Sequence, residues 1–240
     1  MADGPACRRS ARLLIISKPG FSRVFIFIFP AANTIDMSLI ARAKHMIFTP
    51  AAEWRSIGEE RSTAKSLLFS YVIPLALIPA IASFIGYGFV GADGLLFRVI
   101  GLYWGVAMAL DSLITSLTVY WLGTYIIDRM APAFGSSRNF SRSARLMAYS
   151  YTPAWIAGIF YLLPILQELV VLGLFSVYLF YLGIPILKPT PDDQRVAYCI
   201  VSAIIVILIR FVVGLLIINI IYGISGNPYL PYTIIWNRSL

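Results

Sequence analysis

Long apolar stretches alternate with short polar segments along most of this chain. At about 1.5 Å per helical residue, a stretch of about 20 residues crosses a hydrocarbon layer of about 30 Å. Apolar runs such as Ile204–Ile209 do not alternate with polar positions, as the strands of a membrane barrel would. The pattern predicts an all-α, polytopic membrane protein with five transmembrane helices, Ser66–Val90, Val99–Ile127, Leu146–Leu166, Leu169–Leu187 and Tyr198–Tyr222.

The composition agrees with a membrane protein. Hydrophobic residues make up 59% of the 240 and charged residues 12%, which is a more apolar balance than a soluble domain of this size needs. The formal net charge of +8 fits contact with anionic lipid. The predicted partner is therefore the lipid bilayer, and nucleic acid is not needed to explain the charge.

Lysine and arginine collect in alternate loops. Short cytoplasmic loops carry the excess of positive charge in membrane proteins, so this pattern fixes the orientation. It predicts a cytoplasmic amino terminus and a periplasmic carboxyl terminus. The cations of the predicted cytoplasmic side are Arg42, Lys44, Arg55, Arg61, Lys65, Arg129, Arg138, Arg142, Arg145, Lys188 and Arg195, against Arg98 and Arg238 on the other side.

The chain divides into four parts by composition. Residues 1–36 precede a second methionine, Met37, and we interpret them as a poorly ordered extension or as the product of a start assigned to Met1 instead of Met37. Residues 37–65 are predicted to form a cytoplasmic juxtamembrane amphipathic segment. The five-helix membrane domain is expected over residues 66–224, and a periplasmic tail over residues 225–240.

The juxtamembrane segment carries its own helix signals. Apolar residues recur at helical spacing from Leu39 to Ile47, which is typical of a helix that lies on the membrane surface. Pro50 marks the start of a second helix, whose apolar face would carry Trp54 and Ile57. Two interpretations stay open, a short helix without a partner and a docking surface for another protein.

Two ionisable residues lie deep in the predicted membrane region, Asp111 near the middle of the second span and Arg210 near the middle of the fifth. A charge at this depth costs about 2.5 to 3.5 kcal/mol on the lenient insertion scale, so we expect the two side chains to pair. The pair would fasten two helices or serve as a proton or ion relay. Separate roles for the two residues, or an uncharged Asp111, would also fit these positions.

Small residues recur at every fourth position of the second span, at Gly101, Gly105 and Ala109. Such a stripe lets another helix approach closely, within one molecule or between two copies. Five prolines interrupt the spans, at Pro74, Pro79, Pro153, Pro164 and Pro185. They are interpreted as structural kinks, and broken-helix transport sites are the alternative.

The sequence predicts no catalytic, cofactor or metal site. The only histidine, His45, lies outside the spans, which excludes an intramembrane zinc protease motif or serine–histidine triad. An aspartyl dyad needs two carboxylates at one depth, whereas Asp111 stands alone. Cys7 and Cys199 imply no disulfide.

Several motifs together resemble the Yip family of five-span membrane proteins. They are Tyr149–Trp155, Tyr178–Pro185 and Lys188–Pro191, with Pro50–Trp54 and Tyr71–Leu75 similar to its bacterial branch. The motif residues that we single out are Tyr151, Thr152, Pro153, Trp155, Gly183 and Pro185. The resemblance implies five helices and a cytoplasmic amino terminus. Eukaryotic members interact with Rab GTPases and act in vesicle formation, but this chain lacks their long acidic region before the first span.

These observations predict a multi-pass protein of a bacterial inner membrane that is not an enzyme. Its expected role is to organise the membrane or to anchor other proteins, with cytoplasmic proteins or a second copy of the chain as candidate partners. The alternative is a small transporter or channel that uses Asp111 and Arg210.

Overall fold

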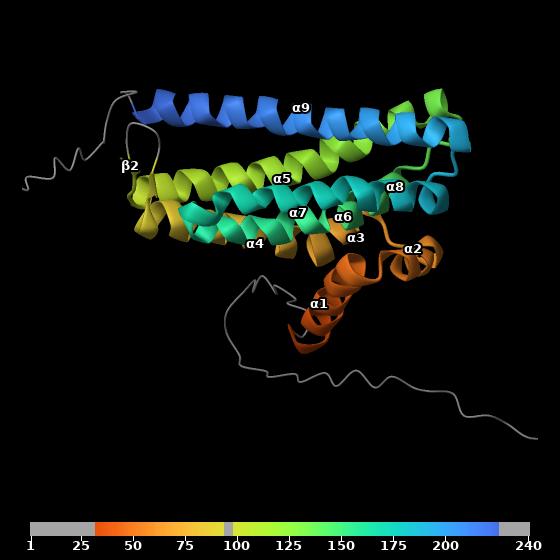
Figure 1. Cartoon of the computed structure of the whole chain (residues 1–240), viewed down its shortest axis with the longest axis horizontal. Helices are drawn as coiled ribbons and strands as arrows, with labels where there is room; N and C mark the ends of the chain where they lie inside the picture. The colour runs from red at the N-terminus through yellow and green to blue at the C-terminus, as the bar shows by residue number, and fades with distance from the viewer. Residues whose placement is uncertain (1–31, 94–97, 226–240) are drawn as a thin grey trace, which may run out of the picture.

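The computed structural model describes residues 32–93 and 98–225 (Figure 1). The predicted tail after residue 225, and the predicted extension up to residue 31, lie outside these residues. The elements are α1 (Ala32–Phe48), α2 (Pro50–Glu59), α3 (Ala64–Leu67), η1 (Leu68–Val72), α4 (Ile73–Ile85), η2 (Gly86–Val90), β1 (Ala92–Asp93), β2 (Arg98–Val99), α5 (Leu102–Met130), η3 (Ala131–Phe134), α6 (Phe140–Ser150), α7 (Thr152–Ala157), η4 (Gly158–Leu162), η5 (Pro164–Leu174), α8 (Phe175–Leu187) and α9 (Asp192–Ser225).

The all-α prediction is confirmed, since only the two-residue strands β1 and β2 interrupt the helices of the described part. Within that part, four helical runs are long and apolar enough to cross a membrane, Ala64–Val90, Leu102–Phe134, Ile165–Leu187 and Asp192–Ile221. They coincide with the predicted first, second, fourth and fifth spans. The predicted third span, Leu146–Leu166, instead falls on the shorter segments α6, α7 and η4, which a turn at Tyr151 interrupts.

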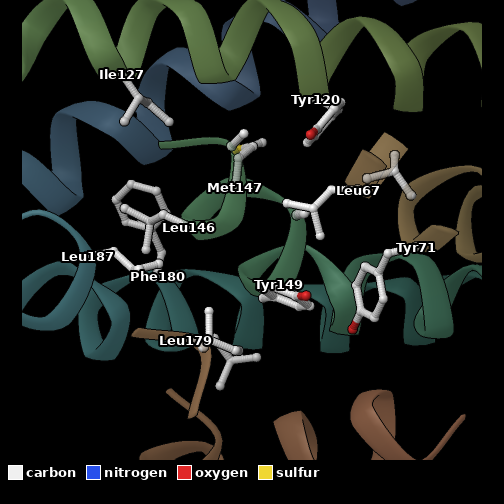
Figure 2. Packing of buried hydrophobic residues seen from close by; sticks show 14 of the residues in the cluster. Leu67, Tyr71, Tyr120, Ile127, Leu146, Met147, Tyr149, Leu179, Phe180 and Leu187 are labelled. Carbon is white, nitrogen blue, oxygen red and sulfur yellow. The ribbon is translucent and has the colours of Figure 1, made fainter. Parts of the chain in front are cut away.

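The third segment differs from the others because it lies at the centre of the bundle. Every residue of α6 from Ser143 to Ser150 is buried. Figure 2 shows Leu146, Met147 and Tyr149 of α6 surrounded by side chains of α5 and α8. A helix that faces protein on all sides needs no lipid-compatible surface, so it can carry polar residues such as Arg145. Its mean hydropathy is lower for that reason.

Three of the five prolines in the predicted spans stand at or near a change of helix geometry, whereas Pro79 and Pro185 lie inside the α-helices α4 and α8. The π-helical η1 ends two residues before Pro74, Pro153 is the second residue of α7 and Pro164 is the first residue of η5. A proline has no N–H to donate to the carbonyl four residues earlier, so the backbone widens or restarts there. The first transmembrane run is therefore a chain of π and α segments in place of one uniform helix.

The two ends of the bundle differ. One end gathers α2, the loop after η3 and the loop between α8 and α9, and the opposite end carries the β1–β2 ribbon (Figure 1). Helix α9 runs along the outside and is the least buried of the four long runs. Helix α1 lies beside the bundle, where it contacts α2, α7 and η1.

Candidate functional site

A cavity of about 340 Å³ lies inside the bundle, between α5, α7, η5, α8 and α9. We call it the Arg210 cavity. Its volume falls within the range of ligand pockets, about 300 to 1,000 Å³. The side chains that line it are mostly apolar, with a small set of hydroxyl groups and one cation. The polar lining residues are Ser112, Ser116, Ser150, Tyr151, Trp155, Tyr161, Ser176, Ser202 and Arg210.

Some of these polar groups are buried without a hydrogen-bond partner. Ser150 is 3% exposed and Ser202 is 1% exposed, and neither hydroxyl makes a hydrogen bond within the described residues. The hydroxyl of Ser176 and the indole N–H of Trp155 are in the same state. Buried polar atoms are normally paired, because an unpaired one costs about 1 to 3 kcal/mol. The cavity wall therefore contains unused hydrogen-bonding capacity, held by polar atoms that lie just beneath its accessible surface.

Arg210 occupies the boundary between the Arg210 cavity and a second pocket of about 460 Å³ between α5 and α9. Its guanidinium donates to the hydroxyl of Tyr161 at 3.4 Å, which is a long hydrogen bond. It also lies near the side chain of Tyr151 on the cavity wall. A Cβ at Gly214, one turn further along α9, would meet no heavy atom within 4 Å, so the side chain has room.

Asp111 lines the second pocket together with Arg210 and Thr115. The two charged residues interact electrostatically across it. No direct ion pair joins them in the part of the chain that the structure describes. The residues that the sequence singles out thus share one pocket, while the nearest hydrogen-bond partner of Arg210 is a tyrosine.

The Arg210 cavity opens sideways, between η5 and α9. Val171, Leu174 and Ile207 line it and are 59%, 60% and 57% exposed. All three are apolar and lie on helical runs that we assign to the membrane. The opening therefore faces the bilayer.

A buried ion pair closes the end of the bundle to which α2 belongs. The ammonium of Lys188 lies 2.6 Å from Oδ1 of Asp128 on α5, and the lysine side chain is only 1% exposed. The same oxygen accepts hydrogen bonds from the backbone N–H of Asn139 and the hydroxyl of Ser143, each at 2.8 Å. Burial lowers the pKa of Lys188, and the carboxylate of Asp128 opposes that shift. These contacts fasten α5, α6 and the end of α8 together.

A second network attaches the juxtamembrane helices to the bundle. Arg42 of α1 donates to Glu60 at 2.6 Å and to the hydroxyl of Tyr149 at 3.0 Å. Arg145 of α6 donates to the carbonyl of Ile57 at 2.8 Å. As the sequence predicts, α2 begins at Pro50 and buries Trp54 and Ile57.

The motif residues occupy several different surroundings. Tyr151 and Trp155 line the cavity with their rings edge to face, and Thr152 bonds to the hydroxyl of Tyr71 at 2.8 Å. Pro153 is buried in the first turn of α7. Gly183 lies against Trp54 and Leu146, whereas Pro185 is exposed on α8.

The small residues of the second span occupy different surroundings. A Cβ on Gly105 would lie 2.7 Å from the carbonyl oxygen of Phe84 and 2.8 Å from the Cα of Gly88, so α5 and the first run touch there backbone to backbone. Gly101 precedes α5 with φ at 136°, where no heavy atom lies within 4 Å of its Cβ position. Ala109 is half-buried.

Sequence reasoning missed Asp128, Glu60 and the serines of the cavity. Lys188 and Asp128 are separated by 60 positions, and nothing in the pattern links them. One signal was present for Asp128, since it stands near the end of an apolar run, where a lone carboxylate needs a partner. The described residues contain no group of three His, Cys, Asp or Glu side chains that could hold a metal ion.

Comparison with protein-family models matches residues 44–233 of the chain to the Yip1 domain. The matched segment covers more than half of the chain and includes α2, the Asp128–Lys188 ion pair, and Glu60, Arg145 and Tyr149 of the second network. No curated protein and no solved structure matches the chain.

Proposed function

Because the chain belongs to the Yip family through its Yip1 domain, and four of its described helical runs can cross a bilayer, we propose that this multi-pass membrane protein organises the membrane without enzymatic activity. The proposal places it in a bacterial inner membrane. Cytoplasmic proteins, or a second copy of the chain, are its candidate partners. The supporting observations come from the third helical segment, the distribution of cations and helix α1.

A fifth span is part of the proposal. The run of α6, α7 and η4 extends from Phe140 to Leu162, 23 residues that are interrupted only at Tyr151. At about 1.5 Å per residue this run is long enough to cross a bilayer. Its central position explains why its polar residues are tolerated, because they face neighbouring helices and not lipid.

The proposed orientation rests on where the cations gather. The networks of Lys188 and of Arg145 bring the loops before α3, after η3 and after α8 to the same end of the bundle. These loops and the helix ends beside them carry a cluster of arginines and lysines, so this end is proposed to be cytoplasmic. The cluster consists of Arg55, Arg61, Lys65, Arg129, Arg138, Arg142, Arg145, Lys188 and Arg195. A fusion of alkaline phosphatase after residue 240 is then expected to be active, because it would lie in the periplasm.

The observation that carries the proposed role is the exposed face of α1. Ile40 is 66% exposed and Phe48 is 73% exposed, and Lys44 lies between them at the same helical spacing. A face of apolar residues and a cation is typical of a helix that inserts into the headgroup region of one leaflet. Arg42, on another face of α1, is bonded to Glu60 and Tyr149, so the helix is held by the bundle. A helix fixed in this way would act as a wedge in the cytoplasmic leaflet.

The test is the shape of liposomes that contain the purified protein at matched protein-to-lipid ratio. We expect wild-type protein to give smaller or tubular vesicles and the variant Ile40→Asn/Phe48→Asn to leave vesicles unchanged. Phe89→Asn is the matched control, because Phe89 is a 64% exposed aromatic residue in η2, near the opposite end of the bundle. The proposal is wrong if wild-type protein leaves the vesicles unaltered, or if the double variant remodels them as wild type does.

A second candidate function is a small transporter or channel, which the two pockets that meet at Arg210 favour. In that case Asp111 and Arg210 would carry a proton or an ion between them. Flux of protons and ions through liposomes with wild type and Asp111→Asn, at matched folded content, tests this function. Flux that the substitution abolishes would support a transporter, and no flux in either would dismiss it.

A further inference from the structure

Arg210 is a membrane-embedded cation without a full counter-charge in its described surroundings. Its hydrogen bond to Tyr161 is long, at 3.4 Å, and Asp111 interacts with it across the second pocket and not through a direct ion pair. A guanidinium has five donors in a planar fork and binds carboxylate or phosphate oxygens in pairs. An anion that entered the Arg210 cavity would find most of these donors available.

The rest of the Arg210 cavity suits a hydrocarbon chain. Its wall carries Val170, Leu174, Val177, Phe180 and Val206, contributed by η5, α8 and α9. Because removing apolar surface from water is favourable, an apolar occupant of this cavity is favoured in proportion to the wall area that it covers. One end of the cavity therefore carries a cation, and the larger part of its surface is apolar.

Access to the cavity comes from the bilayer. The exposed rim residues Val171, Leu174 and Ile207 are apolar, and the opening lies between two helical runs assigned to the membrane. A soluble anion would have to cross lipid to reach this opening. A lipid from the surrounding leaflet would reach the opening without leaving the bilayer, and its head group would move from the interface to the depth of Arg210.

We propose that the Arg210 cavity binds a single-chain lipid with an anionic head group, which enters between η5 and α9. The head group lies against Arg210, Tyr161 and Tyr151, and the chain lies along the apolar wall. Two lipid sources share this chemistry, a fatty acid with its carboxylate and a lysophospholipid with its phosphate. The unpaired hydroxyls of Ser150 and Ser202 would bind ester or hydroxyl oxygens, which a lysophospholipid has near its head group and a fatty acid lacks. This site is independent of the proposed role of α1.

Trp155 lines the Arg210 cavity and gives a direct readout of occupancy. Lipids that carry bromine on their chain quench tryptophan fluorescence on contact. The experiment titrates purified full-length protein in a non-ionic detergent with dibromostearate and with a dibrominated lysophosphatidate. The same titration of Trp155→Phe is subtracted, because Trp121 is also exposed to detergent and lipid. Quenching that saturates and depends on Trp155 is the expected result for at least one of the two lipids.

The charge of the head group is tested with Arg210→Gln. We expect at least tenfold weaker binding, because a charge-assisted hydrogen bond contributes about 1.5 to 3 kcal/mol and each 1.4 kcal/mol is about tenfold. Arg55→Gln is the matched control, since Arg55 is an exposed arginine of α2 outside the cavity, and it should bind as wild type does. Uncharged monoolein should not compete, and acetate or inorganic phosphate should not displace the lipid.

The two lipid sources are separated by Ser150→Ala/Ser202→Ala, which should weaken lysophosphatidate and leave dibromostearate unchanged. If Arg210→Gln does not fold, Ala203→Phe replaces it, because Ala203 lines the cavity and a phenyl ring there should exclude the chain while Arg210 stays in place. The proposal is overturned by Trp155-dependent quenching that neither Arg210→Gln nor Ala203→Phe reduces. It is also overturned if neither lipid gives such quenching, or if monoolein or a free anion competes as well as the lipids.

Discussion

Trp54 of α2 lies so close to Gly183 of α8 that a Cβ on the glycine would come within 2.7 Å of the indole ring. The indole is fully buried and also meets Tyr149 edge to face, with ring centroids 6.5 Å apart. An aromatic side chain of this size contributes much of the apolar area that its helix buries. Helix α2 is therefore part of the packed core of the bundle.

Gly183→Ala should destabilise the protein by about 1 to 3 kcal/mol, because the added methyl group would also meet Leu146 Cδ1 at 2.6 Å in a packed core. The measurement is the midpoint of thermal unfolding of purified protein in detergent. Gly214→Ala is the control, since a Cβ there meets nothing within 4 Å. It should keep or slightly raise the midpoint, as alanine favours a helix over glycine. Equal midpoints for the two variants would contradict the close packing of Gly183.

Lys188→Met should cost about 3 to 5 kcal/mol of unfolding free energy, because it leaves the buried carboxylate of Asp128 without its cation. The double variant Lys188→Met/Asp128→Asn should lose less than the sum of its single changes, since an amide needs no counter-ion. Denaturant unfolding followed by circular dichroism measures all three. Arg195→Gln is the comparison, because its partner Asp192 is 89% exposed and such pairs contribute about 0 to 1 kcal/mol. A Lys188 effect as small as that of Arg195 would show that the buried pair does not fasten the helices.

The sequence predicts how deep a residue lies in the membrane better than it predicts which neighbouring helix its side chain faces. Depth in the membrane can be read from apolar length and from cations. The equal depths of Asp111 and Arg210 predict that the two side chains pair, and in the structure they line one pocket without a direct ion pair between them. Rotation about the helix axis is set by side-chain packing among all the helices, so the sequence did not predict that Arg210 bonds to Tyr161. The pattern also assumes that each span faces lipid, which fails for α6, where Ser143 and Arg145 lie in the core.

Contacts between loops that are distant in the chain could not be predicted from the sequence pattern either. The sequence pattern indicates only that Lys188 is one of the cytoplasmic cations, although the structure buries its side chain against Asp128. In the same way, the sequence does not indicate that Glu60 links α1 to the bundle. Its partner Arg42 lies 18 residues before it and its partner Tyr149 lies 89 residues after it. Periodicity reports the face of one helix and carries no information on which loop folds over which.

Glu60→Gln should release α1 from the bundle. The carboxylate accepts from Arg42 at 2.6 Å and from Tyr149 at 3.1 Å, and a neutral amide weakens both charge-assisted bonds. Hydrogen exchange measured by mass spectrometry should become about tenfold faster or more in α1 and remain unchanged in α5. The neighbouring Glu59→Gln is the control, as Glu59 is exposed and both changes remove one negative charge. If Glu60→Gln leaves exchange in α1 as slow as Glu59→Gln does, the network does not hold this helix.

A charge swap separates the roles proposed for the deep residues. Asp111→Arg alone places two cations around one pocket, and Arg210→Asp alone places two carboxylates there, so each single variant should fold poorly. Asp111→Arg/Arg210→Asp restores opposite charges at the same depth. It should recover most of the folded yield, measured by size-exclusion chromatography in detergent, if the two residues fasten α5 to α9.

A relay would behave differently, because its chemistry depends on which helix carries the acid. The swapped protein would then fold but carry no flux. Recovery of yield with the bound lipid lost would separate the fastening role from the Arg210 cavity, since the swap moves the cation from α9 to α5. A double variant that folds no better than either single change would show that the two charges do not act on each other.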